Sequence, residues 1–163
     1  MDRLLELFAG ILEAPGEDLG MRVRECTRAA AAVGVPAADL DEFARFVENA
    51  PEDAIASLYG SGGLTIGRQL YGEGYGRSML LLDLQKRYRR HGFETGEEPA
   101  DHLAVLLRFL SECDDAAERE ELVREVMVPG LEAMVANEES PAAGTFAPVL
   151  RALTSALREQ VGS

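Results

Sequence analysis

Four side chains that could do chemistry are crowded into one short stretch of the chain. Glu97, Glu98, Asp101 and His102 lie beside Pro99. Carboxylates and imidazoles are common metal ligands, and they are also the usual general acids and bases. Glu98 and His102 are four residues apart, so on a helix they would share one face and could form an ion pair. The composition of this stretch therefore admits a metal site, an acid–base site or a structural ion pair.

A helix start explains part of the same stretch. Pro99 fits the first position of a helix, and Asp101 fits its first turn, where the helix dipole favours a carboxylate. The packing stripe of this helix would consist of Leu103, Leu106, Leu107 and Leu110. Glu98 and His102 are left either with a capping and packing role or with the recognition of a peptide.

The sequence does not favour a metal centre or an enzyme. A carboxylate-bridged dinuclear site in a helical bundle needs paired Glu-x-x-His motifs, which the chain does not offer. Cys26 and Cys113 are far apart and form no Cys-x-x-Cys motif, so they indicate neither a zinc site nor a redox pair. The glycine-rich residues 60–63 and 72–76 lack the context of a phosphate-binding or dinucleotide-binding loop and are interpreted as turns. We therefore expect no catalytic residue, no bound metal and no cofactor.

Helical periodicity predicts the elements on both sides of this stretch. A helix over residues 77–91 precedes it, and its apolar residues cover a wide arc, which predicts a central position in the fold. Pro129 and Gly130 must kink or divide the helix that begins near residue 114. Further helices are predicted at residues 4–12, 18–33, 36–49, 51–59 and 146–161, with a polar link at residues 137–144. Because no strand-length alternation is present, the prediction is an all-α, single-domain bundle of about seven to nine helices over residues 1–163.

The overall charge and hydropathy narrow the range of partners. The formal net charge is −13, from 29 acidic and 16 basic residues. Such a surface repels nucleic acid, whose binding depends on basic side chains that neutralise phosphates. It would attract a basic peptide, although an excess of acids also serves solubility alone. The amino terminus lacks a basic leader followed by an apolar run, and no segment approaches the ~20 apolar residues of a membrane span, which favours a cytoplasmic protein.

Several short motifs occur together in residues 71–110. They are Tyr71-Gly72-Glu73, Arg77, the helix end His91-Gly92-Phe93, and Glu98-Pro99-Ala100-Asp101-His102. In their order and spacing they resemble the cytoplasmic maturation chaperones of molybdenum-containing oxidoreductases. These include the nitrate reductase delta-type chaperones and the related chaperones of trimethylamine-oxide and dimethyl-sulfoxide reductases. Residues 59–70 lack the aromatic-rich run of the nitrate reductase chaperones, so the client enzyme is left open.

The resemblance implies an all-helical chaperone without catalytic turnover. Such proteins bind the amino-terminal segment of a catalytic subunit, often a twin-arginine signal or its remnant. They hold the apoenzyme until the molybdenum cofactor is inserted, before membrane docking or export. An apolar groove with nearby carboxylates would suit a peptide that has both apolar and arginine side chains. The residues expected to bind this peptide are Tyr71, Glu73, Arg77, Tyr88, Glu98, Asp101 and His102.

Two other functions compete with this one. The alternative is a helical adaptor or regulatory module that binds a folded partner, and the weakest hypothesis is an enzyme that uses Glu98, Asp101 and His102 with a metal. If the chaperone hypothesis holds, Asp101→Ala combined with His102→Ala should weaken client binding and barely change the fold. If the two residues serve capping, the same change should lower stability strongly.

Overall fold

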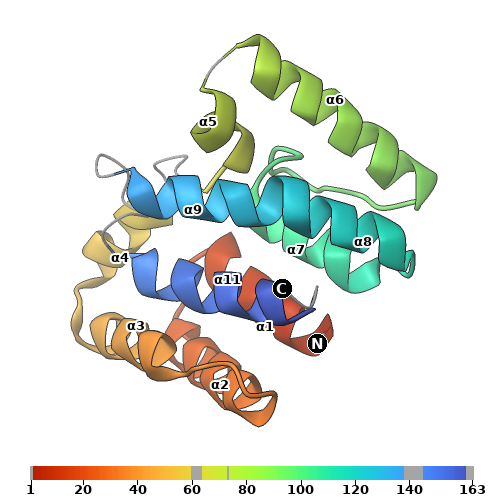
Figure 1. Cartoon of the computed structure of the whole chain (residues 1–163). Helices are drawn as coiled ribbons and strands as arrows, with labels where there is room; N and C mark the ends of the chain where they lie inside the picture. The colour runs from red at the N-terminus through yellow and green to blue at the C-terminus, as the bar shows by residue number, and fades with distance from the viewer. Residues whose placement is uncertain (1, 60–63, 73, 138–144, 161–163) are drawn as a thin grey trace.

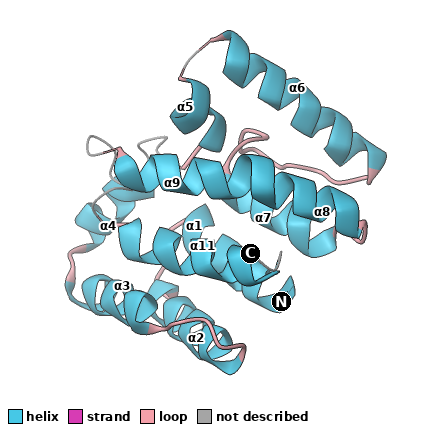
Figure 2. Cartoon of the chain, viewed as in Figure 1, coloured by secondary structure: helices cyan, strands magenta, loops and turns pink. Residues whose placement is uncertain are grey.

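The computed structural model describes residues 2–59, 64–72, 74–137 and 145–160. Most of these residues are helical and none of them belongs to a β-strand, as Figure 2 shows. A single antiparallel bridge joins Thr65 and His102. The predicted all-α fold is confirmed.

The helices follow one another through short connections (Figure 1). Their bounds are α1 (Asp2–Glu13), α2 (Leu19–Ala32), α3 (Ala38–Asn49), α4 (Glu52–Tyr59), α5 (Ile66–Tyr71), α6 (Tyr75–Arg90), α7 (Leu103–Glu112), α8 (Ala116–Leu122), η1 (Val123–Met127), α9 (Val128–Ala136) and α11 (Ala147–Gln160). No helix in the described part of the chain is both long and apolar enough to cross a membrane. The glycine-rich residues 60–63 and, apart from Asn137, the predicted link over residues 137–144 lie outside the described residues.

The hydrophobic core is built around α7, which is buried along most of its length, including Leu103, Leu106 and Leu110. Helix α7 packs mainly against α1, while α11 packs against α3 and α9. Phe43 of α3 stacks on Phe146 with 5.6 Å between the ring centroids. Burying a side chain of this size stabilises the fold by roughly 1.5–3 kcal/mol. The buried residues form one contiguous cluster from α1 to α11, which fixes the position of the amino-terminal end of α7.

Helix α6 is not central, contrary to the sequence prediction. It lies at the edge of the molecule in Figure 1, and its main packing partner is the short helix α5. Only Leu80, Leu84 and Tyr88 of α6 are buried. The apolar residues of α6 cover a wide arc because the helix has two apolar faces on opposite sides, one buried and one exposed. The prediction treated both faces as buried.

The start of α7 also differs from the prediction. The helix begins at Leu103, with His102 as its N-cap residue, rather than at Glu98 and Pro99. Residues 99–102 form a turn in which the N–H of His102 donates to the carbonyl oxygen of Pro99 at 3.0 Å. Helix α5 was not predicted, because its six residues are too few to show a helical period.

The predicted interruption at Pro129 and Gly130 takes the form of a π-helical turn. Helices α8 and α9 and the turn η1 form one continuous helical run, seen across the middle of Figure 1. At the end of η1, the N–H of Val128 donates to the carbonyl oxygen of Val123, five residues earlier. Pro129, which has no N–H and whose ring would clash with the carbonyl four residues earlier in a regular α-helix, follows directly after this wider turn.

Candidate functional site

A buried ion pair lies at the junction of α5, α6 and α7. Asp101 is fully buried, and Arg77 of α6 donates to both of its carboxylate oxygens, from Nε to Oδ2 at 2.9 Å and from Nη2 to Oδ1 at 3.1 Å. The backbone N–H of Gly67 also donates to Oδ2, at 3.1 Å. A Cβ at Gly67 would lie 2.5 Å from that oxygen, so a side chain would displace the carboxylate. The pair therefore holds α5 and α6 against the turn before α7.

Backbone contacts and one tyrosine reinforce the same junction. The N–H of Ile66 donates to the carbonyl oxygen of Asp101, and the N–H of Leu103 donates to that of Leu64, both at 2.9 Å. The buried hydroxyl of Tyr88 donates to the carbonyl oxygen of Ala100 at 2.7 Å. Burial raises the pKa of Tyr88, so this side chain stays a neutral hydrogen-bond donor.

His102 is the N-cap residue of α7, and it is buried. Its Nδ1 accepts the N–H of Ala104 at 3.1 Å, and its Nε2 lies 3.8 Å from Oε2 of Glu98. Glu98 and His102 therefore lie side by side, across a turn and not along a helix, and they form an ion pair only when His102 is protonated. Capping of this kind is worth about 1 kcal/mol.

The cap makes stability depend on pH. Burial lowers the pKa of His102, and the nearby charges of Glu98, Asp101, Arg108 and Glu13 act on it as well. As the pH falls below the ordinary pKa of about 6.5, the unfolded chain binds a proton at this histidine before the folded chain does. Folding stability should therefore decrease through this range. Protonation of Nδ1 would also remove the acceptor for the N–H of Ala104.

His102→Asn should reduce this loss of stability, because an asparagine side chain can cap the helix without titrating. The check is the free energy of unfolding at about pH 7.5 and about pH 5.5 for both proteins, since carboxylate titration common to the two cancels in the difference. An equal loss in the wild type and in the variant would contradict the assignment.

The seven residues expected to bind a peptide fall into different environments. Arg77, Tyr88 and Asp101 are engaged in the contacts described above, and His102 caps a helix. Tyr71 at the end of α5 is exposed, and Glu98 is partly exposed. Glu73 lies outside the described residues. The peptide-binding role of the seven stays a prediction, but most of those that are described have a structural task.

Helix α6 has an exposed apolar face that was not predicted from the sequence. Tyr75, Met79 and Leu82 are 81%, 48% and 52% exposed, and their spacing places them on one side of the helix. Tyr71, at the end of α5, is also exposed and lies beside the start of α6, because a Cβ at Gly76 would lie 2.9 Å from its side chain. These four are among only six large apolar side chains that are exposed in the described part of the chain. We call them the α6 face. The i, i+4, i+7 spacing of Tyr75, Met79 and Leu82 is visible in the sequence, but Met79 and Leu82 were interpreted as part of a central helix and Tyr75 as part of the turn before it.

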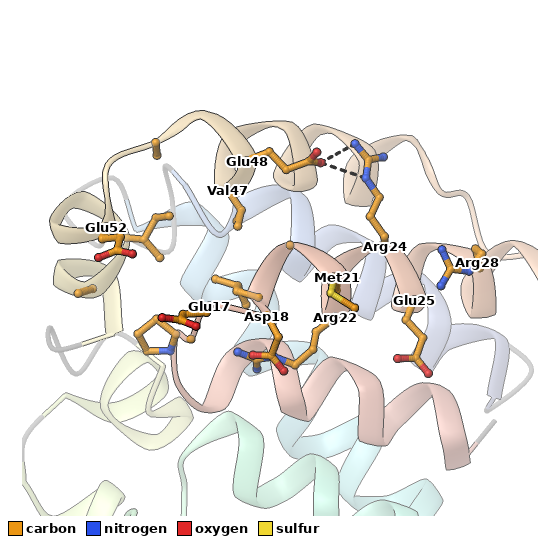
Figure 3. A pocket seen from close by; sticks show the side chains of 17 residues that line it. Glu17, Asp18, Met21, Arg22, Arg24, Glu25, Arg28, Val47, Glu48 and Glu52 are labelled. Atoms are coloured by element: carbon orange, nitrogen blue, oxygen red, sulfur yellow. Dashed lines mark hydrogen bonds and ion pairs between the residues drawn. The ribbon is translucent and has the colours of Figure 1, made fainter.

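A pocket lies on the other side of the molecule, between α2, α3, α4 and the loop before α2 (Figure 3). Its volume is about 990 Å³, and Met21, Val47 and Ile55 contribute apolar lining. Arg24 crosses its rim and is held by Glu48, with 2.7 Å between Nη2 and Oε1. Sequence patterns could not reveal this pocket, because three separate helices form it.

The junction of α5, α6 and α7 and the exposed face of α6 together define a class of protein. The polar residues of the α5–α6–α7 junction are used to hold helices together, and one helix face displays apolar side chains to solvent. An all-α protein with this arrangement is typical of one that binds another polypeptide.

The chain belongs to the nitrate reductase delta subunit family. The family model matches residues 41–139, which is more than half of the chain and includes α4 to α9. The family consists of maturation chaperones of molybdoenzymes, which bind catalytic subunits and are not catalysts themselves. The resemblance inferred from the sequence is thereby confirmed. No curated protein and no solved structure matched the chain in the corresponding comparisons.

Proposed function

We propose that this protein is a cytoplasmic chaperone for the catalytic subunit of a molybdoenzyme. It binds the amino-terminal segment of the apoprotein and holds it until the molybdenum cofactor is inserted, before the enzyme docks at a membrane or is exported. The family match supports the chaperone role. The observation that supports segment binding is the exposed apolar row on α6. We also propose that residues 1–163 act as a single domain, which the contiguous core supports.

The α6 face would receive the apolar side of the client segment. Tyr75, Met79 and Leu82 span about two turns of α6, and Tyr71 at the end of α5 adds a fourth apolar side chain. Such a row suits an amphipathic partner helix with anchors at i, i+3 or i+4, and i+7. Methionine and tyrosine side chains adapt to different apolar partners at low cost. This surface replaces Arg77 and Tyr88 as the primary contact, because those side chains point into the protein.

Carboxylates outside this face would pair with basic residues of the client segment. Asp101 is not available, since Arg77 and Gly67 already occupy both of its oxygens. Glu98 remains accessible, with 43% of its side chain exposed. Glu73 is proposed for the same role from its position in the sequence. The net charge of −13 would also speed the association with a basic segment at low salt.

Met79→Asp should weaken binding of the client segment about tenfold or more, because it places a charge within the apolar contact. The measurement is calorimetry with a synthetic peptide that has the amino-terminal sequence of a molybdoenzyme catalytic subunit from the same genome. Met21→Asp is the matched control, since Met21 is also exposed, at 75%, but lines the pocket of Figure 3.

Each outcome of this experiment has a definite meaning. Weakening by Met79→Asp alone supports the α6 face. If only Met21→Asp weakened peptide binding, the client segment would bind in the pocket, and the assignment to the α6 face would be wrong. If the peptide gave no heat with the wild type while a folded, cofactor-loaded subunit bound, the protein would be an adaptor and not a chaperone for the apoprotein.

A further inference from the structure

Three potential metal ligands from separate parts of the sequence meet beside the carboxyl-terminal end of α6. His91 follows α6, Cys113 follows α7, and Glu118 lies in the first turn of α8. Nε2 of His91 lies 3.0 Å from Oε2 of Glu118. The ring nitrogen, the thiol sulfur and the carboxylate oxygen all lie within 4.8 Å of one another. Cys113 and Glu118 are buried, whereas 26% of the His91 side chain is exposed.

We propose that His91, Cys113 and Glu118 form a binding site for a divalent cation of the zinc class. Nitrogen, sulfur and carboxylate oxygen are the donors that Zn²⁺ uses in proteins, at roughly 2.0–2.3 Å from the ion. A tetrahedral arrangement with these bond lengths would place the donor atoms about 3.3–3.7 Å apart. The histidine and glutamate atoms, 3.0 Å apart, are already near this separation. The sulfur lies within 4.8 Å of both and would have to approach them by up to about 1 Å.

Neighbouring side chains hold two of the ligands in suitable orientations. Oε1 of Glu118 accepts Nη2 of Arg90 at 3.1 Å, which leaves Oε2 directed toward His91. The backbone N–H of Glu118 is capped by Oδ1 of Asp115 at 3.1 Å. The His91 ring packs edge-on against Phe109, with 5.3 Å between the centroids. Such outer contacts orient metal ligands and reduce the cost of ordering them.

Three protein ligands leave one coordination position of the cation open, and water could reach it from the exposed side of His91. On binding, the imidazole of His91 carries its one proton on Nδ1, so that the lone pair of Nε2 binds the cation, and the thiol of Cys113 releases its proton to solvent. The occupied site would join the carboxyl ends of α6 and α7 to the start of α8. It would therefore stabilise the attachment of α6, the helix that presents the α6 face.

The competing interpretation is that His91, Glu118 and Arg90 form an ion-pair network only. The guanidinium groups of Arg90 and Arg87 lie 3.1 Å and 3.5 Å from Oε1 of Glu118, and their positive charges oppose a cation. Arg90→Gln removes one of these charges and keeps an amide N–H that can donate to Oε1, so in a metal site it should tighten cation binding several-fold. A purely structural network would gain no cation affinity from this change.

The test is titration of the metal-free full chain with Co²⁺, followed by displacement with Zn²⁺. A site that includes Cys113 should give one Co²⁺ per chain with a near-ultraviolet sulfur-to-cobalt charge-transfer band, and Zn²⁺ should abolish this band. Cys113→Ala should remove the band and weaken binding at least tenfold. Cys26→Ala is the matched control, because Cys26 is equally buried, lies in α2 and should leave the band unchanged.

His91→Gln provides a second variant if Cys113→Ala does not fold, since its side chain is partly exposed. Zn²⁺ should raise the melting temperature of the wild type and not that of His91→Gln. The absence of a charge-transfer band, its survival in Cys113→Ala, or an equal Zn²⁺ effect on the wild type and His91→Gln would each overturn the proposal. Because none of these measurements uses a client peptide, they are independent of the proposed chaperone function.

Discussion

Asp101→Ala should lower the free energy of unfolding by about 3 kcal/mol, because it removes the buried carboxylate that accepts two hydrogen bonds from the largely buried guanidinium of Arg77. Only 15% of the Arg77 side chain is exposed, and both of its hydrogen bonds to Asp101 would be lost. The N–H of Gly67 would lose its acceptor as well. The measurement is denaturant unfolding followed by circular dichroism, which should show one transition at a lower midpoint if residues 1–163 form a single domain.

Glu120→Gln is the control for this prediction. Glu120 pairs with Arg124 at 2.8 Å on the surface of the α8–η1 run, where both side chains are about half exposed. An exposed pair of this kind contributes little, so the change should stay within about 0.5 kcal/mol. A loss for Asp101→Ala no larger than that would contradict the structural role of the buried pair. It would instead favour the earlier expectation that Asp101 serves binding with little effect on the fold.

Gly130→Ala should destabilise the protein by about 1–3 kcal/mol, although alanine favours helices more than glycine does. A Cβ at Gly130 would lie 2.5 Å from Cγ2 of Ile66, whose side chain is fully buried and cannot move into solvent. Helix α5 would have to separate from α9 to accept the new methyl group. Thermal and denaturant unfolding measure this loss directly.

Gly10→Ala is the matched substitution, because Gly10 also lies within a helix but has no atom within 4 Å of an added Cβ. There the helix propensity of alanine acts alone, and stability should rise by up to about 1 kcal/mol. If both substitutions destabilised the protein equally, the close contact with Ile66 would not be the reason for the glycine at position 130.

The elements that could be predicted from the sequence are those that have one buried face. Helix α3 shows this well, because Leu40, Phe43 and Ala44 are buried while acidic residues occupy the other side. Helix α6 could not be placed in the same way. Its sequence contains apolar residues on two opposite faces, and periodicity does not say which of them is covered by the rest of the chain.

Residues 97–102 were singled out from the sequence, but the contacts that Asp101 makes depend on partners that are distant in the sequence. Asp101 was expected at a helix terminus, yet its charge is matched by Arg77, 24 residues earlier. Cys113 showed no metal motif because its neighbours His91 and Glu118 come from different helices. Contacts of this kind arise only when α6, α7 and α8 pack together, so local patterns do not reveal them.

The π-helical turn at residues 123–127 affects how this chain should be aligned with related sequences. A turn closed over five residues contains one residue more than the α-helical turn it replaces. A relative without that residue could continue as a regular α-helix and still place its counterparts of Leu122 and Leu131 in the core. An alignment of the family should therefore allow a gap of one position here, and forcing the helix to align without it would shift Pro129 and Gly130 by one place.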